Sequence, residues 1–158
     1  MKRIGIIYYS RSDTCRRVAT RLAGHLNCEA YEVSEAHPRI GALGDLACAF
    51  KSFFRLESAI RFSGPRPAVF DHVVYVTPVW MRALSSPIRT FLKRCRDHGK
   101  SYSLVCVMSE QGAERAAREA AVIMRHPPLF TLSLKQYDVL AENFEDELRN
   151  LANRIKAR

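Results

Sequence analysis

Long apolar runs, paired cysteine motifs and uninterrupted basic stretches are all missing from this sequence of 158 residues. Its apolar stretches are far shorter than the roughly 20 residues that a membrane-spanning helix needs. The apolar run near the N-terminus is too short for a signal peptide and is followed at once by Arg11. We therefore expect no membrane span and a cytoplasmic protein.

The five cysteines are widely spaced, odd in number and never arranged as C-x-x-C. A disulfide framework or a zinc site would show paired cysteines at characteristic spacings. The histidines are equally isolated and have no ligand spacing. We predict reduced thiols, no metal site, and histidines that lie at the surface or in loops.

Acidic residues are outnumbered by basic ones, 16 against 25, so the net charge is +9. Such an excess favours encounters with acidic partners or nucleic acid, but it says nothing about the fold. Basic residues gather in two short segments, 16–21 and 89–96, and no nucleic-acid-binding motif is present. A nucleic-acid role is therefore not favoured, whereas an acidic partner and a homo-oligomer both stay open.

Short strand-like runs alternate with longer segments of helical periodicity, which is typical of βαβ units around a parallel sheet. Runs at 4–9, 73–76 and 103–108 are continuously apolar and suit the centre of the sheet, with Pro78 ending the second of them. Runs at 28–33 and 129–134 alternate and suit its edges. Helices are predicted over about 14–26, 46–60, 87–95, 113–125 and 144–156. We predict one domain over 1–158, an α/β three-layer sandwich whose five-stranded parallel sheet has the order 2-1-3-4-5 with helices on both faces.

Ligands of such sheets bind beyond the carboxyl ends of the strands, at the switch point between the first and third strands. Three loops should meet there: 10–15, 77–81 and 109–112. The first loop is rich in small polar residues and opens a helix, whose N-terminal N–H groups and dipole favour an anion such as phosphate. The alternative is an ordinary helix cap with nothing bound. Cys15 at this helix start should have a lowered pKa and a reactive thiol.

At these three loops the sequence resembles flavodoxins and flavodoxin-like, FMN-dependent NAD(P)H:quinone reductases. The segment SRSDTCRRVA is similar to the family's phosphate-binding turn, and TPVWMRALSSPIRTFLKR to its Thr-Pro-aromatic loop with a proline-started helix. The resemblance covers nearly the whole chain in the order of its elements. Asp13 and Cys15 stand where the family's turn usually has a glycine and its last hydroxyl.

The resemblance implies non-covalently bound FMN, with the chemistry on the flavin and no protein nucleophile. The phosphate would contact the hydroxyls of Ser10, Ser12 and Thr14 and the backbone amides of Arg11, Asp13 and Cys15. The ring would be lined by Thr77, Pro78, Val79, Trp80 and Met81, with Trp80 stacking on it, and closed by Ser109, Glu110, Gln111 and Gly112. The alternatives are a partly buried strand-end aromatic for Trp80 and solvated turn residues for Glu110 and Gln111.

By this resemblance the protein is an FMN-binding oxidoreductase or electron-transfer protein. It would pass electrons from NAD(P)H or a protein donor to a small acceptor such as a quinone. The rival is a flavodoxin-like fold that has lost FMN and serves as a binding or regulatory module for an acidic partner. The direction of the Asp13 side chain distinguishes these two hypotheses. If its carboxylate were about 4 Å from the phosphate, repulsion would weaken FMN binding by roughly 1 to 4 kcal/mol per unit charge. A side chain turned toward Arg16 or Arg17 would not oppose FMN.

Overall fold

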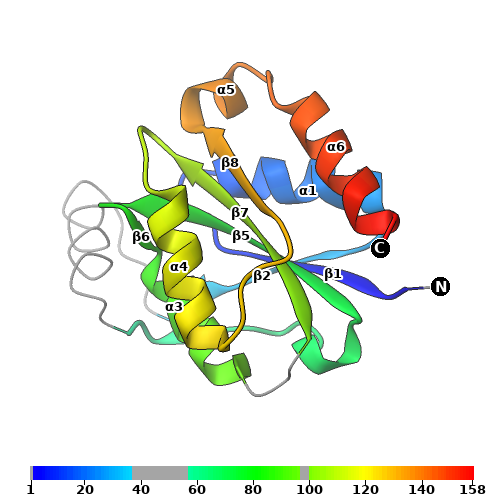
Figure 1. The fold of residues 1–158 in the computed structure, drawn as a ribbon. Coiled ribbons are helices and arrows are strands. Elements are labelled where there is room, and N and C mark those ends of the chain that lie inside the picture. Colours follow the sequence, from blue (N-terminus) through cyan, green and yellow to red (C-terminus); the bar gives the residue numbers. More distant parts are fainter. Residues whose placement is uncertain (1, 37–56, 97–99) are drawn as a thin grey trace.

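The computed structural model describes residues 2–36, 57–96 and 100–158, which form a parallel sheet with helices on both faces (Figure 1). The strands lie in the order β2-β1-β5-β7-β8. Their order along the chain makes this the predicted 2-1-3-4-5 sheet, so the predicted fold class is confirmed. The strands are β1 (Ile4–Tyr8), β2 (Ala30–Glu32), β5 (His72–Trp80), β7 (Ser101–Met108) and β8 (Thr131–Lys135).

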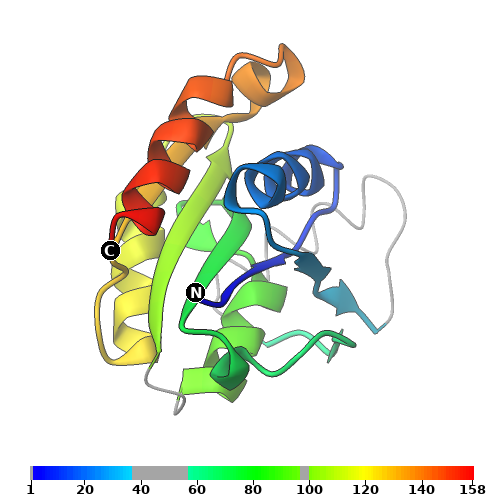
Figure 2. The same cartoon turned by 90° about the vertical axis from the view of Figure 1, so that its right-hand side faces the viewer.

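The central strands are the continuously apolar ones, because both of their faces are covered by helices. On one face lie α3 (Ser86–Cys95) and α4 (Ala113–Met124), and on the other lie α1 (Thr14–Leu26) and α6 (Glu145–Lys156). Figure 2 shows α1 and α6 on one side of the strands and α3 on the opposite side. In the described ranges 2–36, 57–96 and 100–158, no helix combines the length and apolar character of a membrane span.

Helical spacing explains how each helix covers the sheet. Val18 and Leu22, one turn apart in α1, are fully buried, and so are Leu148 and Ile155, two turns apart in α6. Pro87 lies in the first turn of α3, as predicted, where its missing N–H costs no helical hydrogen bond. The result is two apolar cores, one on each face of the sheet.

The prediction that Pro78 ends its strand is wrong. β5 continues to Trp80, and Pro78 is opposite Val107 of β7. β1 ends at Tyr8, opposite Val76, so Pro78 has no β1 residue opposite it. The N–H that proline lacks therefore costs no ladder hydrogen bond to β1. Proline is therefore tolerated in a strand that is central along most of its length.

Several short elements were not predicted from the sequence. They are β3 (Ser34–Glu35), β4 (Ile60–Arg61), β6 (Ala83–Leu84), the 3-10 turn η1 (Pro67–Val69) and α5 (Gln136–Leu140). The helix predicted over 46–60 lies mostly outside the described residues, and its last residue, Ile60, belongs to β4.

His72 contradicts the expectation that the histidines lie at the surface or in loops. It is fully buried at the start of β5, and its ring nitrogens lie 2.9 and 3.0 Å from the hydroxyl oxygens of Ser101 and Ser103 on β7. Burial, followed by the charge of Lys2, lowers the pKa of His72 to about 4. The imidazole is therefore neutral near pH 7.

Candidate functional site

The three predicted loops meet at one edge of the sheet, because β1, β5 and β7 are adjacent and parallel. Tyr9, at the end of β1, packs edge-on against Trp80, with ring centroids 6.1 Å apart. Gly112 lies so close to the second loop that an added Cβ would be 2.7 Å from Cα of Arg82. The first loop therefore adjoins the second, and the second adjoins the third.

The first loop leads into α1 through short polar contacts. The Ser10 hydroxyl accepts a hydrogen bond of 3.2 Å from the backbone N–H of Arg16, and the hydroxyls of Ser12 and Thr14 are 3.3 Å apart. Thr14 is buried, whereas Ser12 and Asp13 are exposed. The side chain of the N-cap residue, Asp13, makes no hydrogen bond to the helix backbone. The hydroxyls and the helix N-terminus that the prediction assigned to a phosphate are thus gathered in one turn.

Asp13 is turned toward two arginines. Its Oδ1 lies 3.1 Å from Nη1 of Arg16, and its Oδ2 lies 3.6 Å from Nε of Arg17. Its backbone is left-handed, with φ 66°, a conformation that Asp tolerates better than most residues other than glycine. Asp13 can therefore occupy a glycine position, and its negative charge is offset locally by the two guanidinium groups.

The second loop is a tight hairpin between β5 and β6. Trp80 pairs with Ala83, and the two residues between them, Met81 and Arg82, have positive φ values of 51° and 59°. Two-residue hairpins favour this geometry, but glycine or asparagine usually supplies it. Trp80 is half-buried and Met81 is 59% exposed. Together with the exposed Arg82, these two residues form the accessible part of the loop.

The other residues predicted in this loop lie at its base. Thr77 is fully buried, and its hydroxyl is 2.9 Å from that of Ser85 and donates to the carbonyl of Pro78. Pro78 and Val79 are also buried. Of the five predicted residues, three are therefore buried and two, Trp80 and Met81, are accessible.

The third loop connects β7 to α4. Ser109, Glu110 and Gln111 are exposed, and the Ser109 hydroxyl donates to Oε1 of Gln136, 3.3 Å away, at the start of α5. Gly112 has φ 132°, which side-chain-bearing residues rarely adopt. A hollow of about 460 Å³ beside this loop is lined in part by Arg82, Glu110, Gln111, Gly112, Arg115 and Arg118.

Solved structures share this architecture. A flavoprotein from Lactobacillus acidophilus NCFM, solved in complex with FMN, superimposes with a TM-score of 0.74 at 15% identity over 89% of this chain and 98% of its own. The present chain has the flavodoxin-like fold. A flavodoxin from Fusobacterium nucleatum, bound to flavin mononucleotide, matches with a TM-score of 0.63 at 13% identity, covering 99% of this chain and 98% of that one.

A Bacteroides uniformis protein gives a TM-score of 0.79 at 16% identity, over 96% of this chain and 98% of its own. No protein-family model matches the sequence, and no curated protein matches it. At these identities the structural likeness establishes the flavodoxin-like fold, and the function has to be argued from the site.

Cys15 differs from its prediction. Cys15 is a residue of α1, and its thiol is buried between this helix and the sheet. Burial, with a smaller contribution from Cys106, raises its pKa far above the ordinary range. Desolvation of the thiolate outweighs the favourable effect of the helix N-terminus. Only the backbone amide of Cys15 could face a ligand in the first loop of this flavodoxin-like fold.

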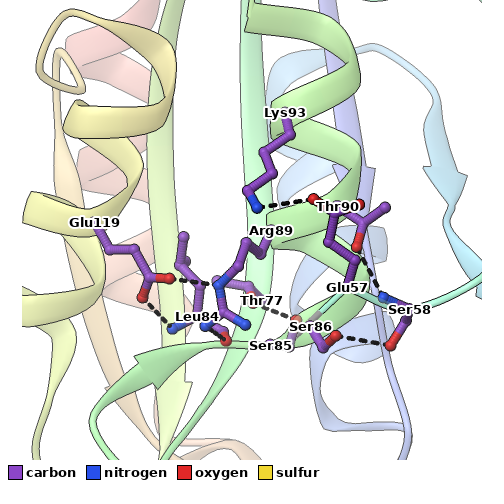
Figure 3. Close-up of polar contacts among 10 residues, drawn as sticks. All are labelled: Glu57, Ser58, Thr77, Leu84, Ser85, Ser86, Arg89, Thr90, Lys93 and Glu119. Carbon is purple, nitrogen blue, oxygen red and sulfur yellow. Dashed lines mark hydrogen bonds and ion pairs between the residues drawn. The ribbon is translucent and has the colours of Figure 1, made fainter. Parts of the chain in front are cut away.

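A buried ion pair that was not predicted from the sequence lies behind the second loop. Nε of Arg89 on α3 lies 2.5 Å from Oε1 of Glu119 on α4 (Figure 3). Glu119 also accepts the backbone N–H of Leu84 at 3.2 Å, and Arg89 donates to the carbonyl of Leu84 at 2.9 Å. The pair thereby holds both backbone groups of a β6 residue. No sequence signal links the two side chains, which are 30 positions apart.

Proposed function

We propose that this chain binds FMN and acts as an electron-transfer protein or oxidoreductase. One observation carries the proposal: the three loops form a continuous rim at the switch point of a flavodoxin-like fold. The orientation of Asp13 supports it, because its carboxylate is offset by Arg16 and Arg17. The similarity to proteins solved with bound FMN is consistent with the same ligand.

The residues of the rim fit the parts of FMN. The first loop would hold the phosphate through the hydroxyls of Ser10, Ser12 and Thr14 and the N-terminal amides of α1. The half-buried indole of Trp80 and the exposed Met81 would contact the ring on one side. Ser109 to Gly112 would close the other side, and Thr77 and Val79 would support the hairpin from below.

When bound, FMN supplies one-electron and two-electron redox chemistry, and the protein contributes position and electrostatics. NAD(P)H or a donor protein would deliver the electrons, and a small acceptor such as a quinone would receive them. The net charge of +9 argues against a shuttle that docks on basic partners. A reductase, or a shuttle for an acidic partner, fits this charge better.

The direct test is a titration of FMN into purified, flavin-stripped protein. Trp80 is the only tryptophan of the chain, so quenching of its fluorescence would report events at the second loop specifically. We expect stoichiometric, sub-micromolar binding of FMN. Riboflavin should bind at least about tenfold more weakly, since it lacks the phosphate and its charge-assisted hydrogen bonds.

A Trp80→Ala variant tests the stacking contact, with flavin fluorescence as the readout. An aromatic pair contributes about 0.5 to 1.5 kcal/mol, so FMN affinity should fall by up to about tenfold, whereas Trp80→Phe should retain most of it. Equal affinity of all three proteins would exclude stacking on Trp80. If FMN does not bind even at millimolar protein, the function is that of a binding module without flavin.

A further inference from the structure

The two helical faces of the molecule differ in how their arginines are neutralised. On the α1 side, Arg16 and Arg17 pair with Asp13, Arg16 also pairs with Glu32, and Arg21 pairs with Glu142 at 3.1 Å. Each of these three arginines of α1 thus has at least one acidic neighbour. The positive charge on this face is largely offset within the molecule itself.

The opposite face has a groove between α3 and α4, which we call the arginine groove. It has a volume of about 430 Å³ and is lined by Arg89, Lys93, Arg115, Arg118, Glu119, Val122 and Ile123. Four of these side chains are basic and one is acidic. The groove therefore carries an excess of positive charge, in contrast to the α1 side.

Partners within the chain offset only part of this charge. Arg89 forms an ion pair with Glu119. Lys93 lies 2.8 Å from Glu57, and the side chains of Lys93 and Glu57 are both substantially exposed. Arg118 lies 3.9 Å from Glu114 at a highly exposed site, where such a pair contributes little. Among the described residues, no acidic side chain forms an ion pair with the exposed Arg115.

The arginine groove extends toward the candidate FMN site. Arg115 and Arg118 line both this groove and the hollow beside the third loop, to which Arg82 and Gly112 also belong. Arg82 is part of the hairpin turn that presents Trp80. Glu110 and Glu114 line the hollow as well, so its three arginines outnumber its acidic side chains by one. A surface with a net positive charge thus runs from the α3–α4 groove to the rim of the three loops.

An exposed apolar centre accompanies the charges. Val122 is 80% exposed and Ile123 is half-buried, and both line the groove beside its basic side chains. Apolar residues surrounded by charged and polar groups are typical of protein–protein interfaces, in which the apolar centre contributes most of the affinity and the charges steer the approach. Binding to a nucleic-acid backbone would gain little from Val122.

We propose that the arginine groove is the docking surface for an acidic redox protein. Carboxylates of the partner would pair with Arg115 and Arg118, and an apolar residue would cover Val122. A partner seated there would lie beside the Trp80 hairpin and hence beside the proposed flavin. The redox character of the partner rests on the proposed function, whereas the docking surface rests only on charge and shape.

The test measures binding of a purified acidic [2Fe–2S] ferredoxin, used as the probe, to flavin-free protein. The test variant is R115E/R118E. The control is K156E/R158E, which changes the charge equally at exposed positions near the C-terminus. At low salt the test variant should weaken binding at least about tenfold, and the control less than about threefold. Thermal unfolding of both variants checks that each is folded.

Absence of ferredoxin binding at low salt, or equal losses in the two variants, would overturn the proposal. So would tighter binding of a short duplex DNA than of the ferredoxin, since it would assign the surface to nucleic acid. Because docking is measured without flavin, it is independent of the FMN titration. Failure of FMN to bind would overturn the proposed function and leave the docking result intact.

Discussion

Gly112 is the residue at which the third loop touches the hairpin of the second. Its φ of 132° and the 2.7 Å that an added Cβ would have from Cα of Arg82 leave no room for a side chain. Gly24 in α1 offers the contrast, since an added Cβ there would meet nothing within 4 Å. Two glycines of the same chain thus have opposite structural requirements.

We predict that Gly112→Ala destabilises the fold by about 1 to 3 kcal/mol, because it adds backbone strain and a close contact with Arg82. Gly24→Ala should instead stabilise it by about 0.5 to 1 kcal/mol through helix propensity. Urea unfolding followed by Trp80 fluorescence measures both. A Gly112→Ala variant as stable as the wild type would show that the two loops can separate freely.

At the scale of elements, the short strand β6 depends on the helices behind it. The strand has only two residues, Ala83 and Leu84, and the Arg89–Glu119 pair bonds both the N–H and the carbonyl of Leu84 (Figure 3). The side chains of this pair are 1% and 7% exposed, so each charge depends on the other for compensation. The pair therefore joins α3, α4 and the Trp80 hairpin.

Glu119→Ala should destabilise the protein by about 3 to 5 kcal/mol, because it leaves the Arg89 charge buried without its carboxylate. Replacing both residues in R89M/E119L should cost less than Glu119→Ala alone, because it removes both charges. Urea unfolding measures the stabilities, and the emission maximum of Trp80 should shift to the red if the hairpin loosens. A loss below about 1 kcal/mol in Glu119→Ala would contradict this role.

At the scale of the whole molecule, stability should depend on pH through His72. Its pKa is about 4 in the folded protein against 6.5 for an unperturbed histidine, so the unfolded chain binds this proton more readily. The contribution of His72 to stability is full above pH 6.5 and is lost as the pH falls toward 4. The shift corresponds to about 3 kcal/mol.

A His72→Gln variant tests this prediction, because glutamine keeps hydrogen-bonding groups near Ser101 and Ser103 and does not titrate. Between pH 7 and pH 4.5 the wild type should lose about 2 kcal/mol more unfolding free energy than the variant. Urea unfolding at several pH values provides the comparison. Parallel losses in the two proteins would mean that His72 is protonated without penalty.

Local patterns of the sequence were sufficient to predict the order of the strands and the positions of the main helices. Continuous apolar runs at β1, β5 and β7 and alternating ones at the edges predicted the strand order, because burial on both faces demands apolar residues at every position. Helical spacing of apolar residues predicted α1, α3, α4 and α6. The positions of the three loops followed from this order, since the carboxyl ends of adjacent parallel strands share one edge of the sheet.

Other features depend on contacts between distant parts of the chain and could not be predicted from local patterns. Pro78 continues its strand because β1 ends beside it, and Cys15 has a raised pKa because α1 packs on the sheet. Asp13 turns to Arg16 and Arg17, although phosphate was an equally plausible neighbour by sequence. Periodicity reports which side of an element is buried, whereas side-chain direction and desolvation depend on what that side packs against.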